Sequence, residues 1–237
     1  MTSVMKLFGI ADLHLGFEVD KPMTKFGPHW ADHAARVEAA WRRLVGPGDV
    51  VLVPGDLSWG MTEEDSKADR AWFAALPGTK VVVKGNHDYW WPKSRARLEA
   101  ALGPTVRPLK RNAARVGDVA FVGVRGCDLV PLREKTEADV AKEVARELAD
   151  LDASIADYRA RFAPAPRVVA LCHYPPFALG SSASAFTERV EAAGADLCVY
   201  GHLHDAEEWR ATFQGARNGV TYRLLAADAI GFEPIPL

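Results

Sequence analysis

Short apolar runs, each followed directly by polar side chains, constrain the fold of this 237-residue chain more than any other feature. Six such β-rich runs alternate with segments of helical periodicity, and this alternation predicts a layered α/β fold with parallel strand pairs. The runs are Lys6–Ala11, Val50–Pro54, Lys80–Lys84, Val119–Val124, Arg167–Cys172 and Asp196–Tyr200. The helical segments between several of them are Trp30–Val45, Thr62–Leu76, Ser94–Leu102 and Ala185–Ala193.

A longer helix is predicted over about Lys135–Phe162, where apolar residues recur at steps of three or four along one face. The tail has a different pattern, because Glu208–Phe213 and Val220–Ala226 are strand-like and flank the turn signal Arg217-Asn218-Gly219. The sequence has no internal repeat and no clear linker. We therefore expect residues 1–237 to form one domain.

Composition excludes several classes of protein. The formal net charge of −2 gives little support for a nucleic-acid or anionic-membrane binder. No run reaches the ~18 apolar residues of a membrane span, and the first apolar run is interpreted as a strand, not as a signal peptide. The three cysteines, Cys127, Cys172 and Cys198, lack CxxC spacing. They are predicted to be free, buried thiols, which favours a reducing cytoplasm.

Five of the strand-like runs end in side chains that commonly bind metals. In open α/β sheets, ligands bind beyond the carboxyl ends of the strands, so these side chains are expected to converge on one site. The predicted metal ligands are Asp12, His14, Asp56, Asn86, His173, His202 and His204.

Two spacings within this set carry a geometric expectation. Residues i and i+2 of an extended chain point to the same side, so Asp12 with His14, and His202 with His204, are expected to face one site. Glycines precede three of the ligand clusters and are expected to let the backbone turn sharply and approach the ions closely: Gly55, Gly85 and Gly201.

The ligand types limit the metal. Carboxylate, imidazole and amide oxygen without thiolate suit first-row ions such as Mn²⁺, Fe, Zn, Ni or Co better than Ca²⁺ or a soft metal, and Mn²⁺ is the ion we expect. Seven ligands are too many for one tetrahedral zinc and suit two divalent ions that share a carboxylate and a water. Two such ions form a clamp for in-line displacement at phosphorus.

The motifs DLH, GD, GNHD, a lone histidine before Tyr-Pro-Pro, and GHLH occur here in that order, between residues 12 and 204. Together they resemble the motifs of the calcineurin-like metallophosphoesterase superfamily, and the opening resembles a group of bacterial predicted phosphohydrolases within it. The resemblance implies a four-layer α-β-β-α sandwich, in which two mixed sheets are flanked by helices.

The resemblance also implies roles for individual residues. One metal would be held by Asp12, His14 and His204, and the other by Asn86, His173 and His202, with Asp56 bridging them. His87 matches the family histidine that stabilises the transition state or protonates the leaving oxygen.

The sequence departs from the protein Ser/Thr phosphatases of this superfamily. Trp59 stands where those enzymes have an aspartate that orients the catalytic histidine, and the arginine that follows it there is absent. Asp88 is predicted to replace that acid beside His87, with Glu63 or Asp65 as alternatives.

Five further side chains are candidates for substrate contact. Arg125, at a strand end, either holds a phosphate oxygen or forms a surface ion pair. The aromatic residues form either a stacking wall for a flat leaving group or ordinary packing. They are Trp59, Tyr89, Trp90 and Trp91.

These features predict a cytoplasmic, dinuclear-metal-dependent phosphoester hydrolase with a small phosphorylated substrate. A water between the ions is expected to attack phosphorus while His87 assists the leaving group. Phosphodiesters or nucleotides are favoured, and phosphomonoesters of small metabolites are the alternative. A non-catalytic interaction scaffold with the same fold is disfavoured by the complete ligand set. A DNA nuclease is disfavoured by the near-neutral charge.

Overall fold

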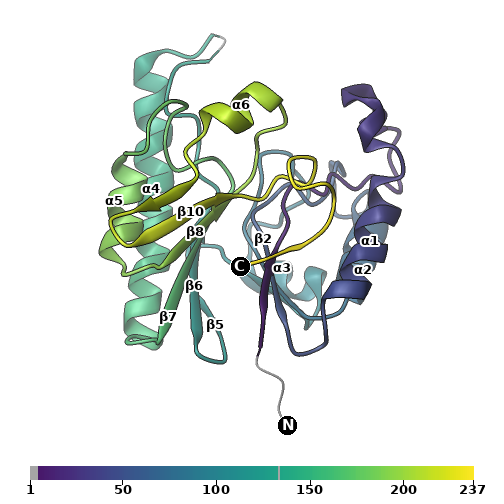
Figure 1. Ribbon diagram of the computed structural model, residues 1–237, viewed down its shortest axis with the longest axis horizontal. Coiled ribbons are helices and arrows are strands. Elements are labelled where there is room, and N and C mark those ends of the chain that lie inside the picture. Colours follow the sequence, from purple (N-terminus) through teal and green to yellow (C-terminus); the bar gives the residue numbers. More distant parts are fainter. Residues whose placement is uncertain (1–4, 133) are drawn as a thin grey trace.

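The computed structural model describes residues 5–132 and 134–237. Two mixed β-sheets lie face to face in it, and helices cover their outer faces (Figure 1). The predicted four-layer α-β-β-α arrangement of two mixed sheets flanked by helices is therefore confirmed.

The first sheet has the strand order β11-β1-β2-β3-β4. Its parallel strands are β1 (Leu7–Gly9), β2 (Val50–Val53), β3 (Thr79–Val82) and β4 (Val106–Pro108), and β11 (Ile235–Pro236) pairs antiparallel with β1. Parallel pairing places the carboxyl ends of β1 to β4 at one edge of the sheet.

The second sheet has the order β5-β6-β7-β8-β10-β9. Its four central strands are parallel and its two edge strands are antiparallel to their neighbours. The strands are β5 (Ala114–Val116), β6 (Val119–Val124), β7 (Arg167–Cys172), β8 (Leu197–Tyr200), β9 (Gly215–Arg217) and β10 (Val220–Leu224). The predicted bounds of β6 and β7 match the observed ones.

Strand periodicity explains the layers. In β2, Val51 and Val53 face the helices and pack in one cluster with Trp41, whereas Val50 and Leu52 belong to the cluster between the two sheets. Alternate residues of a strand point to opposite faces, so a strand buried on both faces is apolar throughout. The three hydrophobic clusters thus separate four layers.

The helices lie on the two outer faces of the sandwich (Figure 1). The first sheet is covered by α1 (His33–Leu44), α2 (Lys67–Ala75) and α3 (Arg95–Leu102), and the second by α4 (Glu137–Arg161) and α5 (Ala185–Ala192). Short 3₁₀ turns occur at Met23–Phe26 and Pro28–Trp30. Within the described residues, no helix has both the length and the apolar character needed to cross a membrane.

Capping explains where α4 begins. Its N-cap, Thr136, accepts a hydrogen bond from the Asp139 N–H, and the Asp139 side chain accepts one in return from the Thr136 N–H. This reciprocal pair satisfies backbone donors that have no partner within the helix. The apolar stripe predicted for the segment, including Leu151 and Ile155, faces the second sheet.

One predicted strand is wrong. Glu208–Phe213 was expected to pair with the strand that begins at Val220, but Ala206–Ala211 form the short helix α6. The side chain of Asp205 accepts a hydrogen bond from the Glu207 N–H and so starts a helical turn. The predicted turn itself is confirmed, since Asn218 and Gly219 adopt φ values of 47° and 83° between β9 and β10.

Candidate metal centre

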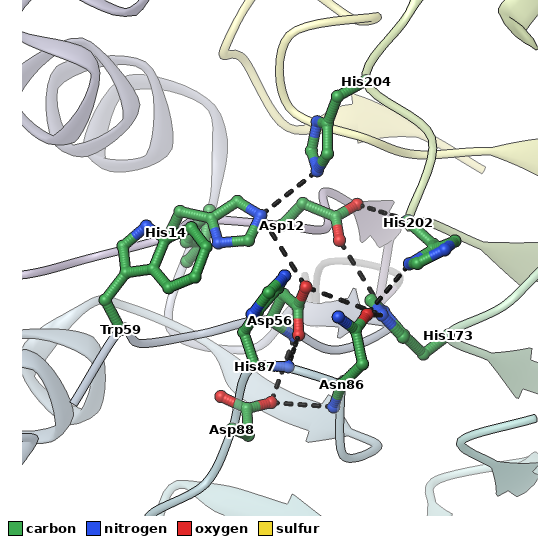
Figure 2. Close-up of polar contacts among 12 residues, drawn as sticks. Asp12, His14, Asp56, Trp59, Asn86, His87, Asp88, His173, His202 and His204 are labelled. Carbon is green, nitrogen blue, oxygen red and sulfur yellow. Dashed lines mark hydrogen bonds and ion pairs between the residues drawn. The ribbon is translucent and has the colours of Figure 1, made fainter. Parts of the chain in front are cut away.

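All seven predicted metal ligands lie close together, in loops that follow five different strands (Figure 2). The loops after β1, β2 and β3 come from the first sheet, and those after β7 and β8 come from the second. The site therefore spans the junction of the two sheets at the edge where their parallel strands end, as expected for open α/β sheets.

The backbone around the ligands is not extended. Asp12, His14, Asp56 and His202 have φ values of 57°, 44°, 52° and 77°, in the left-handed region that side chains with a Cβ rarely adopt. The assumption of an extended chain for the i and i+2 pairs is therefore wrong, because β1 and β8 end before these residues. Strained backbone of this kind recurs at functional sites, where the surrounding structure holds it in place.

At two positions a neighbouring ligand side chain lies so close to the backbone that glycine is required. A Cβ on Gly85 would lie 2.0 Å from Oδ1 of Asp56, and a Cβ on Gly201 would lie 2.4 Å from Oδ2 of Asp12. Any side chain at either position would displace a predicted ligand, so only glycine fits.

One group of ligand atoms comes from Asp12, His14 and His204, which lie within 4.8 Å of one another. Nε2 of His14 is 3.1 Å from Nε2 of His204. Oδ2 of Asp12 accepts a hydrogen bond from the His202 N–H at 2.9 Å, which leaves Oδ1 directed into the site.

A second group of ligand atoms surrounds Oδ1 of Asn86. Nε2 of His173 lies 2.6 Å from this oxygen, and Nδ1 of His202 lies 2.9 Å from it. Nδ1 of His173 is 3.0 Å from the carbonyl oxygen of Pro54. Because a carbonyl can only accept, Nδ1 carries the proton, and Nε2 faces the site with a free lone pair.

Asp56 lies between the two groups. Its Oδ2 is 3.7 Å from Nε2 of His14 and 3.6 Å from Nε2 of His173. Its Oδ1 accepts a hydrogen bond from the His87 N–H at 2.8 Å. One carboxylate oxygen therefore borders both sets of imidazoles, while the other holds the carboxylate in place.

Burial sets the protonation of most of the cluster, and His204 is the exception, because, despite burial, Asp228 and Asp12 raise its pKa to about 9. Burial lowers the pKa of His14, lowers that of His173 to about 3 and lowers that of His202 to about 2. It raises the pKa of Asp56 to about 6 and that of Asp12 well above its ordinary range. Neutral imidazoles are the form that binds metal, and a cation would stabilise the two buried carboxylates.

The donor set fits divalent cations. Among the described residues, the only buried side-chain polar atoms without a hydrogen-bond partner are Oδ1 of Asp12 and Nδ1 of His14, both in this cluster. Nε2 of His173 and Oδ1 of Asn86, two atoms with lone pairs, lie in close contact. Lone pairs from five loops thus point at one another, an arrangement that bound cations would stabilise.

His87, the predicted catalytic residue, lies beside this cluster. Its ring centroid is 4.2 Å from that of Trp59, and the Trp59 ring is also stacked 4.7 Å from His14. No hydrogen bond holds the His87 ring within the described part of the chain, so Trp59 positions it by packing. Nε1 of Trp59 lies 3.0 Å from Sδ of Met23, which fixes the indole.

The predicted orienting role of Asp88 is wrong. Its buried carboxylate accepts hydrogen bonds from the N–H groups of Gly85, Asp56, Leu57 and Ser58 at 2.8 to 3.2 Å, and none from the ring of His87. Asp88 instead ties the loop after β3 to the loop after β2. Glu63 and Asp65 bond elsewhere, to Arg97 and Thr62.

The substrate candidates take different positions. Trp90 is 2% exposed and donates from Nε1 to Asp88, so its predicted substrate role is wrong and it belongs to the core. Tyr89 is 54% exposed and lies at the rim beside His87. Arg125 pairs with the buried Glu147 at 2.6 Å, the ion-pair alternative, although it also lines a pocket beside the site.

Asp228 is a site residue that the sequence analysis missed. Its buried carboxylate lies 3.1 Å from Nδ1 of His204 and orients that ring. The sequence does contain a signal for this residue, because Asp228 follows the apolar run of β10 just as the predicted ligands follow their own apolar runs.

Metal-binding side chains gathered where parallel strands end, at the junction of two sheets, are typical of metal-dependent hydrolytic α/β proteins. The sequence profile of the calcineurin-like phosphoesterase family matches residues 5–206 of this chain. The chain belongs to this family.

Individual proteins add little about substrate. The gene 66 proteins of Mycobacterium phages L5 and D29 are 33% identical over 85 residues and 36% identical over 86 residues. Each alignment covers 36% of this chain and 41% of the phage protein, so the chain spans about two fifths of these curated relatives.

Two solved structures are similar over nearly the whole chain. The phosphopantetheinyl hydrolase of Mycobacterium tuberculosis has a TM-score of 0.53 and 15% identity, with coverage of 98% of this chain and 95% of that protein. A protein of unknown function from Aquifex aeolicus has a TM-score of 0.49 and 13% identity, with coverage of 98% and 96%. The similarity to the Mycobacterium tuberculosis hydrolase supports only the fold of this chain.

Proposed function

We propose that this protein is a dinuclear-metal-dependent hydrolase of small phosphodiesters or nucleotides. The observation that carries the proposal is the position of Asp56, whose Oδ2 lies 3.7 Å from His14 and 3.6 Å from His173. A carboxylate between two groups of imidazoles suits a bridging ligand, and a bridging ligand implies two ions.

Each ion would have its own set of residues. Asp12, His14 and His204 would hold one, Asn86, His173 and His202 would hold the other, and Asp56 would serve both. When bound, Mn²⁺ or a similar first-row ion pair would lower the pKa of a water and neutralise phosphoryl oxygens.

The chain's own residues would then position the ester. Burial lowers the pKa of His87, although the charge of Asp56 opposes this shift, and the lowered pKa favours the neutral imidazole. A neutral imidazole donates a hydrogen bond to a phosphoryl or leaving-group oxygen without adding charge. Trp59 would hold that ring in place by packing against it.

The proposed preference for phosphodiesters is based on residues at the rim of the candidate site. Tyr89 is 54% exposed beside His87 and offers a ring on which a base or other flat leaving group can stack. The loop Gly55-Asp56-Leu57-Ser58-Trp59-Gly60 also lacks the phosphate-holding arginine of the protein phosphatases.

The test compares two chromogenic esters with the Mn²⁺-loaded protein. We expect faster hydrolysis of bis-p-nitrophenyl phosphate than of p-nitrophenyl phosphate, and two ions per chain by elemental analysis. Asp56→Asn should reduce kcat by about a hundredfold or more, because it weakens the shared ligand. Asp196→Asn, which removes a half-exposed partner of Arg167, is the matched control.

Two outcomes would count against the proposal. A strong preference for the monoester would remove the diester assignment, and a stoichiometry of one ion would remove the dinuclear centre.

All three cysteines are free and buried, which supports a reducing cytoplasm as the compartment. The shared core between the two sheets supports one domain.

A further inference from the structure

A basic pocket of about 440 Å³ lies beside the candidate metal centre. Six lysine and arginine side chains line it, against two carboxylates. The cations are Lys84, Lys93, Lys110, Arg111, Arg125 and Arg146, and the acids are Glu147 and Asp150.

The two carboxylates are already paired. Glu147 accepts from Arg125 at 2.6 Å and from Arg146 at 3.2 Å, and Asp150 pairs with Arg111. These pairs account for the three arginines of the pocket and leave its three lysines without an acidic partner.

None of the three lysines is held in an ion pair within the described residues. Within residues 5–132 and 134–237, no carboxylate lies within ion-pair distance of Lys84, Lys93 or Lys110. Nζ of Lys110 donates only to the carbonyl oxygen of Pro92, at 2.5 Å. Burial and the nearby charge of Lys84 lower the pKa of Lys110, although the charge of Asp150 opposes the shift.

Strand topology places this pocket next to the metal centre. Lys84 follows β3, Lys110 follows β4 and Arg125 follows β6, so the pocket lies at the same carboxyl edge of the sheets as the ligand loops. The carbonyl of Arg125 accepts a hydrogen bond from the His173 N–H at 3.1 Å. The exposed ring of Tyr89, near His87, lines the pocket as well.

Charge and position together indicate the ligand. Three ammonium groups without an ion pair concentrate positive charge in one concave site, and an anion bound among them would offset that charge. A phosphate group is a strong acceptor for several lysines at once. Because the pocket adjoins the metal centre, one substrate molecule can place its ester bond at that centre and another of its groups in the pocket.

We propose that the basic pocket binds a second phosphate of the substrate, so that the preferred substrates are phosphoesters that carry a further phosphate group. This inference rests on the proposed hydrolase function and specifies its substrate class. It assigns Lys93 and Lys110 as specificity-determining residues.

The kinetic test uses two esters that differ by one phosphate. Thymidine 5′-(p-nitrophenyl phosphate) and its 3′-phosphorylated derivative both release p-nitrophenol. With the Mn²⁺-loaded protein, we expect the 3′-phosphorylated ester to have a KM lower by about tenfold or more. Lys93→Gln and Lys110→Gln should each reduce that preference by roughly fivefold, since each removes one charge-assisted contact.

A matched control keeps the test specific. Lys67→Gln, which removes an exposed lysine paired with Glu64, should leave the preference unchanged. Equal KM values for the two esters, or a preference that survives both pocket substitutions, would overturn the proposal.

A binding measurement separates this inference from the hydrolase proposal. The full chain is dialysed against EDTA, so that the metal centre cannot hold phosphate, and is titrated calorimetrically with inorganic tripolyphosphate. We expect binding that weakens about fivefold in Lys93→Gln and in Lys110→Gln but not in Lys67→Gln.

The combined results distinguish the two failures. Intact tripolyphosphate binding with no hydrolysis of any ester would overturn the hydrolase function alone. Hydrolysis of both esters without tripolyphosphate binding would overturn the basic pocket alone. Tripolyphosphate binding with no discrimination between the esters would assign the pocket to a free anion and overturn the substrate assignment.

Discussion

Both carboxylate oxygens of Asp228 lie 3.1 Å from Nδ1 of His204. The Asp228 side chain is fully buried, so the pair is protected from competing water. A carboxylate in this position keeps a proton on Nδ1 and turns Nε2 towards His14 and the candidate metal centre. The segment after β10 thereby takes part in a site whose other members come from earlier loops.

Asp228→Asn should weaken metal binding. The amide cannot supply the negative charge that orients the imidazole and raises its basicity, and loss of such a partner typically costs about 10- to 100-fold in metal affinity. Titration calorimetry with Mn²⁺ measures the effect, and far-UV circular dichroism checks the fold. Asp196→Asn serves as the control at a half-exposed site, and equal affinities in the two variants would contradict the role of Asp228.

Metal affinity should also rise with pH. Burial alone would lower the pKa of His204, but the hydrogen bond to Asp228 and the charges of Asp12 and Asp228 raise it to about 9. Below that pH, a proton must leave His204 before a metal binds, so affinity should increase by up to about tenfold per pH unit between pH 7 and 8.5. Calorimetry at several pH values measures the slope. A flat profile would contradict the raised pKa.

Asp88→Asn should destabilise the fold and the site together. The carboxylate accepts four backbone N–H groups and the Trp90 Nε1–H, whereas an amide would turn its own donor towards some of them. Loss of charged, buried hydrogen bonds predicts a decrease of about 2–4 kcal/mol in the free energy of unfolding. Urea denaturation measures it. Asp65→Asn, at an exposed turn, should cost less than about 1 kcal/mol.

The clustering of the candidate ligands could be predicted because its signal is local. Each candidate ligand follows an apolar run, and these runs end at the common edge of the two sheets, where strand pairing brings them together. The bounds of β6 and β7 could be predicted for the same reason, since both strands are buried on both faces and read as continuous apolar segments.

Other features depend on tertiary contacts that leave no local pattern. The strands Val106–Pro108 and Ala114–Val116 are three residues long, and only their neighbours define them. Three of the hydrogen bonds of Asp88 come from a loop 30 to 32 residues earlier in the chain. The spacing of apolar residues in Glu208–Phe213 is compatible with either a strand or a helix. The hydrogen bond that caps the segment at Asp205 favours the helix.

Trp59→Ala should alter catalysis through His87. The indole packs 4.2 Å from the His87 ring, and its removal would leave that ring mobile and exposed. Burial lowers the pKa of His87, so exposure should raise it towards 6.5 and move the acid limb of the pH–rate profile to higher pH. We expect kcat for bis-p-nitrophenyl phosphate to fall about tenfold. Trp59→Phe retains a ring and should lose less, and an unchanged profile in Trp59→Ala would contradict this role.

Lys80 should make stability depend on pH in alkaline solution. Its buried Nζ donates to the Leu76 carbonyl at 2.6 Å and to Oγ1 of Thr105 at 3.0 Å, and burial lowers its pKa from 10.5 to about 8. Between these values the unfolded chain binds more protons, so the free energy of unfolding should rise with pH, by up to about 3 kcal/mol. Lys80→Met should remove that rise, and exposed Lys67→Met should keep it. Urea denaturation from pH 7.5 to 10.5 measures both, and equal slopes in the two variants would show that the rise comes from other groups.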